Sequence, residues 1–338
     1  MPRNRQILLD NRPAGQATEH NFRLVSCETP ALQDGQLLVR NNYLSLDPYM
    51  RGRMNDAKSY AAPQPLGQVM VGVTAGEVVE SRNTAFQLGD KVVGRGGWQE
   101  YSVMDTAPAS GLRKVDTGRI PLNVYLGAMG MPGITAWIGL VKICEPKLGE
   151  TVVVSAAAGA VGSAVAVLSR VRACHTVGIA GGADKCRYGV EELGLDACVD
   201  YKRHSDAVSL SRALMQACPR GVDCYFENVG GMVQDAVLPL MNPHGRIAVC
   251  GMVAGYDGAL IPMANPQLIL NSRLTLRGFT VGERTELWPE ALGELGTLVA
   301  SGKLRPRETI AQGIAAAPQA FLGMLKGHNF GKQLVQLI

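Results

Sequence analysis

The chain has 338 residues, of which 46% are hydrophobic and 18% charged, with 33 Lys and Arg against 29 Asp and Glu. This length corresponds to about two domains, and the apolar content supplies a core, which excludes a disordered chain. The formal net charge of +4 includes no run of like charge, so neither nucleic acid nor a membrane surface is expected as a partner.

Residues up to about 120 are expected to form mainly β-structure. Their apolar runs are short, as at 36–46, 69–79 and 91–96, and Gly, Pro, Asn and Asp turn signals separate them. No long helical period intervenes, so the sequence predicts a compact, barrel-like module in this part of the chain.

From about residue 134 the pattern changes to strands that alternate with helices. Helices are expected at 134–143, 160–173, 184–194, 208–218, 232–241, 288–302 and 318–327, and strands at 152–155, 176–180, 197–201, 222–227, 246–251, 273–279 and 332–338. Such alternation requires a parallel sheet covered on both faces, so we predict an α/β, doubly wound fold. The expected domains are a β-rich domain at 1–125, a dinucleotide-binding domain at 126–303, and a return to the first domain at 304–338.

Eight cysteines form no CxxC pair; they stand at positions 27, 144, 174, 186, 198, 218, 224 and 250. Scattered cysteines indicate buried, reduced thiols of a cytoplasmic protein, and the early charges of Arg3 and Arg5 exclude a signal peptide. Residues 151–169 include 19 uncharged positions, the length of a membrane span. Gly159 and Gly162 interrupt them, however, so a strand, a turn and a buried helix are favoured.

Residues 152–162 carry the pattern of a dinucleotide-binding turn between a strand and an Ala-rich helix. Aligned on G-x-G-x-x-G, positions 157, 159 and 162 hold Ala, Gly and Gly. Gly159 would let the backbone approach a pyrophosphate, Gly162 would let the helix pack on the strand, and the helix N-terminus would supply amide donors. Because Ala157 departs from the pattern, a tight turn that binds nothing is the alternative.

The end of the next strand indicates which cofactor this turn would take. An NAD site would place an acid there, but 177–182 contains no Asp or Glu, and its two glycines leave space. Lys185 and Arg187 follow, and space plus a cation suits a 2′-phosphate, so the sequence predicts NADP. Asp184 is the dissenting residue unless it caps the next helix. The alternative for Lys185 is a solvated lysine at a helix start.

The residues that would bind a catalytic or structural zinc ion are missing. A zinc dehydrogenase would carry a Cys three residues before an Asp in the first domain, where Leu44 precedes Asp47. None of the five histidines lies in a Gly-His-Glu pattern, and the cysteines are not clustered. We therefore predict no metal site, and the G-x-S-x-G, HExxH and Walker patterns are absent as well.

Three tyrosines near expected loops remain as candidates for acid–base chemistry: Tyr49, Tyr60 and Tyr256. A phenol can donate a hydrogen bond to a carbonyl oxygen or a developing enolate without a metal. Each tyrosine could instead be a rim or packing residue.

Seven motifs, in order along almost the whole chain, resemble one family. They are YLSLDPYMRGRM (43–54), GAMGMPGITAW (127–137), AAAGAVGS (156–163), GIAGGADKC (178–186), YFENVGG (225–231), CGMVAGY (250–256) and MLKGHNFGKQ (324–333). The chain thus resembles the zinc-free branch of the medium-chain dehydrogenase/reductases, in the group of leukotriene 12-hydroxydehydrogenase/prostaglandin reductases, plant alkenal double-bond reductases and bacterial NADPH-dependent curcumin reductases. The resemblance implies a Rossmann domain with a β-rich, GroES-like barrel domain, and a homodimer.

The resemblance also implies roles for individual residues. NADPH would contact Thr135, Ala158, Gly159, Ala160, Val161, Gly181, Lys185, Tyr201, Asn228, Cys250, Gly251, Tyr256, Phe279, Thr280, Val281 and Asn329. Tyr49 and Tyr256 match family positions that face the substrate carbonyl, and Tyr60 would line the pocket. The implied reaction is conjugate reduction of an enone or enal: hydride reaches the β-carbon, and Tyr256, Tyr49 or a ribose hydroxyl stabilises the enolate.

Other functions remain open at this point. Relatives on the same scaffold oxidise allylic alcohols with NADP, and others reduce quinones, although DPYMRGRM argues against the quinone group. A protein that binds NADPH without turnover is a further alternative. The segment 257–266 is shorter and less Pro-rich than the usual loop of these reductases, which puts the substrate's identity in doubt.

Overall fold

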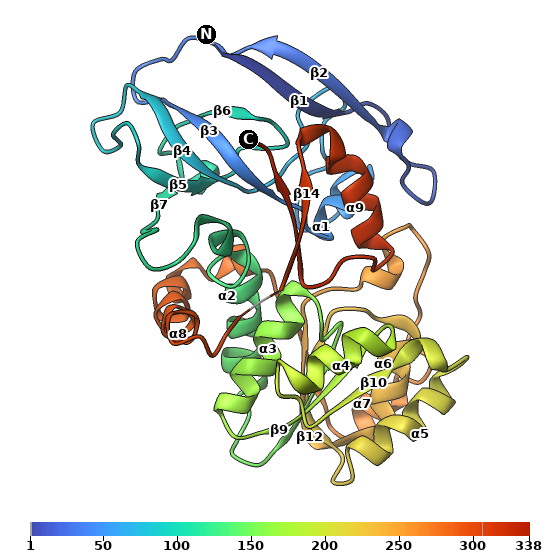
Figure 1. The fold of residues 1–338 in the computed structure, drawn as a ribbon. Helices are drawn as coiled ribbons and strands as arrows, with labels where there is room; N and C mark the ends of the chain where they lie inside the picture. Colours follow the sequence, from blue (N-terminus) through green and yellow to red (C-terminus); the bar gives the residue numbers. More distant parts are fainter. Residues whose placement is uncertain (1, 306) are drawn as a thin grey trace. The chain divides into compact units, whose positions relative to one another are not determined.

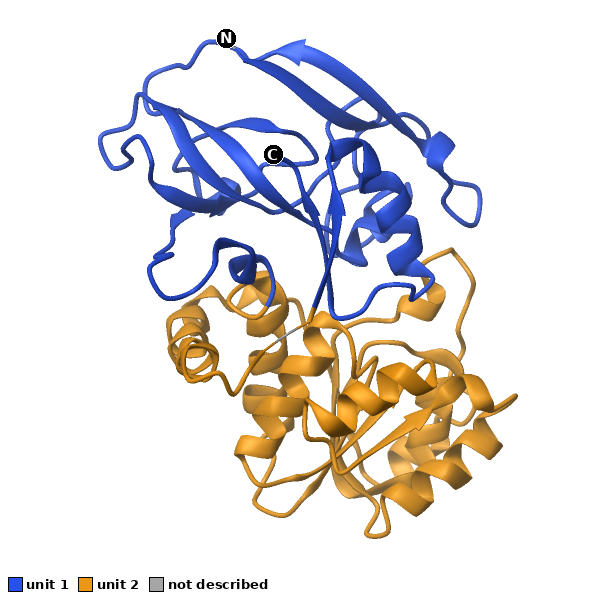
Figure 2. Cartoon of the chain, viewed as in Figure 1, with its two compact units in different colours: residues 1–127, 308–338 blue, residues 128–307 orange. Residues whose placement is uncertain are grey.

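The computed structural model describes residues 2–305 and 307–338, and the chain forms two compact units (Figure 2). Unit 1 comprises residues 1–127 and 308–338, and unit 2 comprises residues 128–307. The boundaries expected from the sequence, 125/126 and 303/304, lie two and four residues from these. The roles of the two units as catalytic and dinucleotide-binding domains stay a prediction.

Unit 1 is built on a seven-stranded sheet with the order β14-β15-β3-β4-β5-β7, in which β6 pairs with β3, and on a separate β1-β2 hairpin (Figure 1). The strands are β1 (Arg3–Leu9), β2 (Phe22–Glu28), β3 (Leu37–Ser45), β4 (Thr74–Ser81), β5 (Lys91–Gly94), β6 (Tyr101–Met104), β7 (Arg113–Lys114), β14 (Glu308–Gln312) and β15 (Lys332–Gln336). β15 lies antiparallel to β3, with Leu334 opposite Ser45. The C-terminal strand therefore completes the sheet that the N-terminal part begins.

Two helices, α1 (Tyr49–Arg53) and α9 (Ala317–Leu325), contribute to the core of unit 1. Its centre is an aromatic cluster, in which the Phe22 and Trp98 rings stack at 5.4 Å and Phe321 meets Trp98 edge-on at 5.5 Å. Edge-to-face and offset-stacked pairs are the favoured geometries of buried rings.

Unit 2 is a six-stranded sheet in the order β10-β9-β8-β11-β12-β13, and every neighbouring pair is parallel. The strands are β8 (Thr151–Ser155), β9 (His175–Ala180), β10 (Ala197–Asp200), β11 (Val222–Glu227), β12 (Met241–Val249) and β13 (Thr275–Gly278). The chain runs outward from β8 through β9 and β10 and then resumes at β11 on the other side. The strand order thus reverses between β8 and β11, as the doubly wound prediction requires.

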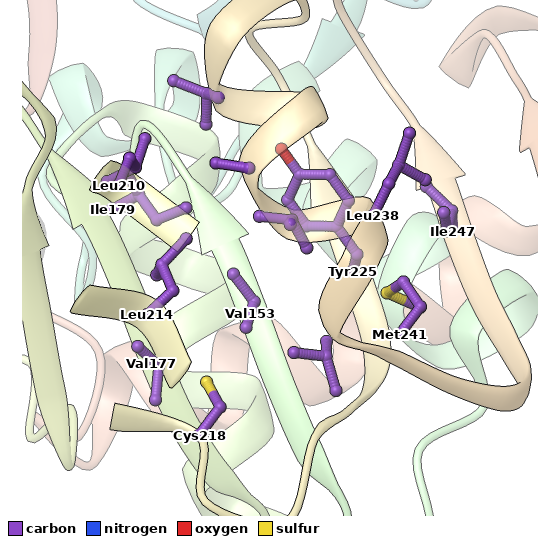
Figure 3. Packing of buried hydrophobic residues seen from close by; sticks show 14 of the residues in the cluster. Val153, Val177, Ile179, Leu210, Leu214, Cys218, Tyr225, Leu238, Met241 and Ile247 are labelled. Carbon is purple, nitrogen blue, oxygen red and sulfur yellow. The ribbon is translucent and has the colours of Figure 1, made fainter. Parts of the chain in front are cut away.

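The helices of unit 2 are α2 (Met131–Trp137), α3 (Ala160–Val171), α4 (Ala183–Glu191), α5 (Ala207–Ala217), α6 (Gly231–Val237), α7 (Gln267–Asn271) and α8 (Trp288–Ala300). Figure 3 shows the core on one face of the sheet, where Val153 and Val177 of the strands pack with Leu210 and Leu214 of α5. Crossover helices of this kind cover a parallel sheet because its strands are apolar on both faces.

Two predicted helices differ from the structure. The helix expected at 134–143 continues from α2 into a π-helix, Ile138–Cys144, whose wider turns have no signature in the apolar pattern. The helix expected at 232–241 is α6 followed by a 3₁₀ turn, Leu238–Leu240, and β12 begins at Met241. Pro239 explains this end, since proline has no amide hydrogen to continue the helix.

The prediction of uniformly buried thiols is also wrong in part. Cys144, Cys174, Cys218 and Cys224 are buried, but Cys27 is exposed on β2. In the part of the chain that the structure describes, no helix has the length and apolar character needed to cross a bilayer.

Candidate functional site

The predicted cofactor residues of unit 2 gather at the carboxyl ends of its parallel strands. Directly after these strands follow 156–161 (β8), 181–185 (β9), 201–202 (β10), 228–231 (β11), 250–256 (β12) and 279–281 (β13). Parallel strands end at one edge of the sheet, so segments far apart in the sequence line a single edge, and ligands of doubly wound sheets bind at this edge.

At the reversal between β8 and β11, a buried hydrogen-bond network joins the two strand ends. The fully buried Glu227 accepts hydrogen bonds from Ser155 Oγ (2.8 Å), Tyr225 Oη (2.6 Å) and the Val229 amide (2.6 Å). Asn228 donates its amide hydrogen to Ser155 Oγ and its Nδ2 hydrogen to the Ser155 carbonyl, both at 2.8 Å. Burial raises the pKa of Glu227 despite these donors.

The same strand end holds the loop that carries Tyr256. The amides of Cys250 and Gly251 donate to the Glu227 carbonyl at 2.9 and 3.2 Å, and the Ala254 amide donates to the Val229 carbonyl at 3.0 Å. A Cβ atom at Gly251 would lie 3.4 Å from the Tyr256 hydroxyl. The phenol of Tyr256 is therefore directed at the predicted cofactor segment 250–251.

Burial raises the pKa of the Cys250 thiol to about 12, with Glu227 adding to the shift. The thiol stays protonated at neutral pH, which makes it a packing group rather than a nucleophile.

The turn into α3 explains the two glycines of its motif. A Cβ atom at Gly162 would lie 2.3 Å from the Ala156 carbonyl oxygen, a contact that no side chain can accommodate. At Gly159 the same distance would be 3.1 Å. Gly159 caps α3, and the first amides of this helix, Ala160 and Val161, have no partner inside the helix, so they can donate to a phosphate.

Two lysines meet at the ends of β9 and β10. A Cβ atom at Gly181 would lie 2.9 Å from Tyr201 Cε1 and 3.0 Å from Lys202 Cε. Burial, and then the charge of Lys202, lowers the pKa of Lys185, so the two ammonium groups are near one another. We call this site, formed by Gly181, Tyr201, Lys185 and Lys202, the lysine corner. The small Gly181 leaves space, and the phenol and the two ammonium groups can donate hydrogen bonds to a 2′-phosphate.

The acids of this corner are already engaged. Asp184, which counted against NADP, forms an ion pair with Arg187 on the exposed side of α4. Asp200, at the end of β10, accepts the amides of Gly182 (2.8 Å) and Lys202 (3.1 Å). Neither carboxylate removes the cationic character that Lys185 and Lys202 supply.

At the other end of the edge, aromatic packing supports the segment after β13. The Phe279 ring meets Phe226 edge-on at 6.4 Å, and a Cβ atom at Gly139 would clash with both rings. The Val281 carbonyl accepts Trp288 Nε1 at 3.1 Å. Thr135 is buried in α2, which packs against the segment 281–283 that follows Thr280.

The remaining predicted residues belong to unit 1. Tyr49 opens α1 half-buried against the core, and burial, followed by Asp47, raises the pKa of its phenol, while Arg95 and Arg53 oppose the shift. The phenol therefore stays protonated and can donate a hydrogen bond. Tyr60 is 66% exposed and near enough to Tyr49 to raise its pKa further.

Asn329 lies in unit 1 at a groove of about 260 Å³ between β14 and α9. Its Nδ2 group donates to the Gly331 carbonyl at 2.7 Å. The structure thus places Asn329 with Tyr49 and Tyr60 in unit 1, and Tyr256 with the other cofactor residues in unit 2.

The sequence interpretation missed three residues of the edge: Lys202, Ser155 and Glu227. An acid at the end of an otherwise apolar strand, as in VDCYFE, was a signal for Glu227. Lys202 offered only its position next to Tyr201. Within residues 2–305 and 307–338, no group of three or more His, Cys, Asp or Glu side chains could hold a metal ion.

Comparison with known proteins follows the same division of the chain. Residues 5–115 match a family described as the N-terminal domain of oxidoreductase, and residues 160–297 match the family of zinc-binding dehydrogenases. The NADPH-dependent curcumin reductase of Escherichia coli is 45% identical, over 99% of this chain and 97% of that protein. The NADP(+)-dependent 2-alkenal reductase of Nicotiana tabacum is 38% identical, over 99% of this chain and 97% of that protein.

A solved structure is similar over the same length. CurA from Vibrio vulnificus in complex with NADPH superposes with a TM-score of 0.92 at 41% identity, covering 99% of both chains. The fold is therefore that of a two-domain oxidoreductase with a Rossmann domain, as predicted. The chain belongs to the medium-chain dehydrogenase/reductase family, in the group that contains the curcumin and alkenal reductases, and this confirms the family predicted from the seven motifs.

Proposed function

We propose that the chain is an NADPH-dependent reductase of the carbon–carbon double bond of α,β-unsaturated ketones and aldehydes. The NADPH specificity rests on one observation: Tyr201 and Lys202 lie against Gly181, and Lys185 is near Lys202. The curcumin and alkenal reductases that the chain resembles over almost its full length support the substrate class.

The residues at the carboxyl ends of the parallel strands include a group suited to each part of NADPH. The lysine corner would hold the 2′-phosphate, the start of α3 the pyrophosphate, Asn228 the ribose region, and 250–251 with 279–281 the nicotinamide half. When bound, NADPH supplies a hydride for the β-carbon of the substrate. The other chemistry that we assign belongs to the chain's own residues.

Tyr49 and Tyr256 are the two side chains that we assign to the substrate's carbonyl oxygen. A neutral phenol donates a hydrogen bond that strengthens as negative charge grows on that oxygen, and this lowers the barrier. The phenol can also hold the proton that the reaction consumes. Tyr60 is assigned to the substrate pocket without a chemical role.

Separate and paired Tyr49→Phe and Tyr256→Phe variants test these assignments. We expect kcat to fall about 100-fold for the tyrosine that contacts the carbonyl, with the Kd for NADPH within twofold of the parent. Tyr101→Phe in β6 is the matched control. Unchanged turnover in the double variant would remove both tyrosines from the mechanism.

The function itself is tested by the loss of NADPH or NADH absorbance with a medium-chain enone, an enal, curcumin and a simple quinone. Fast turnover of the enones with NADPH alone is the expected result. If the quinone is reduced and the enones are not, the quinone oxidoreductase alternative is favoured. If an allylic alcohol is oxidised with NADP, the reverse reaction is favoured. NADPH binding without any turnover would indicate a non-catalytic protein.

A homodimer in the cytoplasm completes the proposal. β13 ends the parallel sheet with three of its four residues exposed, and Leu270 in the preceding helix is 69% exposed. An uncovered sheet edge next to apolar side chains favours pairing with another chain. Light scattering during gel filtration should give twice the chain mass, and a charge introduced by Leu270→Glu should shift the protein toward the monomer.

A further inference from the structure

Unit 1 contains a buried ion pair that the proposed reaction does not use. The side chains of Lys332 in β15 and Asp47 after β3 are only 2% and 5% exposed, and their Nζ and Oδ1 atoms are 3.1 Å apart. Lys332 Nζ also donates to the carbonyls of Leu46 (2.6 Å) and Gln333 (3.0 Å), and Ser45 Oγ donates to Asp47 Oδ2 at 2.5 Å. Every donor of the ammonium and both oxygens of the carboxylate therefore have partners.

A buried pair of this kind is costly as a source of stability alone. Removing two charges from water costs several kcal/mol per ion, which an apolar pair of similar volume avoids. A specific geometric role is therefore the natural explanation to test for Lys332 and Asp47.

Asp47 of this pair also lies just before α1 and bonds to its first turn. The Asp47 carbonyl accepts the Met50 amide at 3.1 Å, and α1 has only five residues, too few to be stable without tertiary contacts. Met50 and Arg51 are buried and anchor one side of the helix. Asp47 anchors its start, two residues before Tyr49.

The charges around Tyr49 make this position sensitive. Burial has the largest effect in raising the pKa of the Tyr49 phenol, and the nearby charge of Asp47 raises it further. Arg95 and Arg53 act in the opposite direction. Lys332 balances Asp47 from the other side, and it also faces Glu308 across the β14–β15 pairing. A shift of the carboxylate would therefore move both the backbone of Tyr49 and the field at its hydroxyl.

We propose that the Lys332–Asp47 ion pair, clamped by Ser45, is the positioning element that sets Tyr49 at the start of α1 for its hydrogen bond to the substrate. This inference rests on the proposed function, in which Tyr49 contacts the substrate carbonyl. Lys332 and Asp47 are buried and would act through Tyr49 as positioning residues.

A double-mutant cycle between Asp47→Asn and Tyr49→Phe tests this inference with the full-length protein. Asp47→Asn keeps the side-chain volume and an acceptor for Lys332 but removes the charge. We expect kcat for an enone to fall at least tenfold in this variant, while the KM for NADPH stays within twofold. Combined with Tyr49→Phe, the substitution should add less than a twofold loss to that of Tyr49→Phe alone, because the positioned group is then absent.

Two further variants separate positioning from folding. Glu100→Gln is the matched control, since it makes the same acid-to-amide change at a buried carboxylate in unit 1 that is paired with Arg5. Its kcat should stay within twofold of the parent. If Asp47→Asn does not fold, Ser45→Ala removes only the clamp on Asp47 Oδ2 and should lower kcat about threefold, again without effect in the Tyr49→Phe background.

The outcomes distinguish this inference from the proposed function. Independent, multiplying losses in the cycle, or a normal kcat in Asp47→Asn and Ser45→Ala, would overturn the positioning role and leave the reductase function intact. Full turnover by Tyr49→Phe alone would overturn it as well, since nothing would remain to be positioned. If the parent protein reduces none of the enones, both the proposed function and this inference are overturned.

Discussion

The Ser155 hydroxyl and the Glu227 carboxylate meet at 2.8 Å where the parallel sheet reverses its strand order. This bond ties the end of β8, which leads into the predicted phosphate-binding turn, to the end of β11, where the Glu227 and Val229 carbonyls accept amides of the segment 250–256. The buried carboxylate receives hydrogen bonds from two hydroxyls and a backbone amide. Glu227 therefore connects the segments on both sides of the predicted cofactor site.

Glu227→Ala should weaken the cofactor site and the fold together. It leaves the Tyr225 hydroxyl and the Val229 amide without the acceptor that they have in the parent, and it leaves Ser155 Oγ with only the Phe226 carbonyl at 3.4 Å. Each unsatisfied buried donor costs about 1–3 kcal/mol. We expect the Kd for NADPH, measured by fluorescence titration, to rise at least tenfold, with a lower Tm. Glu227→Gln retains an acceptor oxygen and should stay within threefold of the parent, so equal binding by the alanine variant would contradict the organising role.

Lys185→Ala and Lys202→Ala should convert the cofactor preference. A hydrogen bond to a charged group contributes about 1.5–3 kcal/mol, so each substitution should raise the Kd for NADPH about 10- to 150-fold. The Kd for NADH, which lacks the 2′-phosphate, should change less than twofold. Arg212→Ala on the exposed side of α5 makes the same change in net charge and serves as the control. Parallel losses for NADPH and NADH would show that the lysines do not recognise the 2′-phosphate.

Local patterns predicted the fold of unit 2 and its glycine turn, because the alternation of strands and helices and the glycine turn are properties of short segments. Most other residues at the strand ends were implied only by the family resemblance. Pairs of residues that are distant in the sequence could not be predicted in this way. Lys332 and Asp47 are 285 positions apart, and neither signals the other. Likewise, the meeting of Lys202 with Gly181 depends on the β9–β10 pairing, which a single strand does not specify.

Gly162→Ala should destabilise unit 2, since its Cβ would lie 2.3 Å from the Ala156 carbonyl oxygen in the predicted phosphate-binding turn. Overpacking of this kind costs about 1–3 kcal/mol, and we expect a lower Tm and loss of NADPH binding. Gly293→Ala in α8 is the matched control, because nothing lies within 4 Å of its added Cβ. The control should gain about 0.5–1 kcal/mol from helix propensity. Equal Tm values for the two variants would contradict the packing argument at Gly162.

The Glu150–Arg246 pair should make unit 2 sensitive to acid. Arg246 Nη1 lies 3.1 Å from Glu150 Oε1, and Arg246 Nε donates to the Cys144 carbonyl at 2.7 Å. Burial has the largest single effect and would raise the pKa of Glu150, but the hydrogen bonds from Arg246 and the Lys147 amide and the charges of these two residues together outweigh burial and hold that pKa below its ordinary value. A lowered pKa in the folded state means that the pair stabilises the fold above the unfolded pKa, about 4.3, and that this is lost as the pH falls through the folded pKa.

Glu150→Gln should therefore lower the Tm at pH 7 and have little effect near pH 3. The lost charged hydrogen bond, about 1.5–3 kcal/mol, corresponds to a Tm difference of about 3–12 °C for a unit of this size. Glu145→Gln, at an exposed acid five residues earlier, should leave the Tm unchanged at both pH values. The contrary result is a Tm difference between Glu150→Gln and the parent that stays constant from pH 7 to pH 3. That result would mean that the Glu150 side chain stabilises unit 2 by packing and not by the charge of its carboxylate.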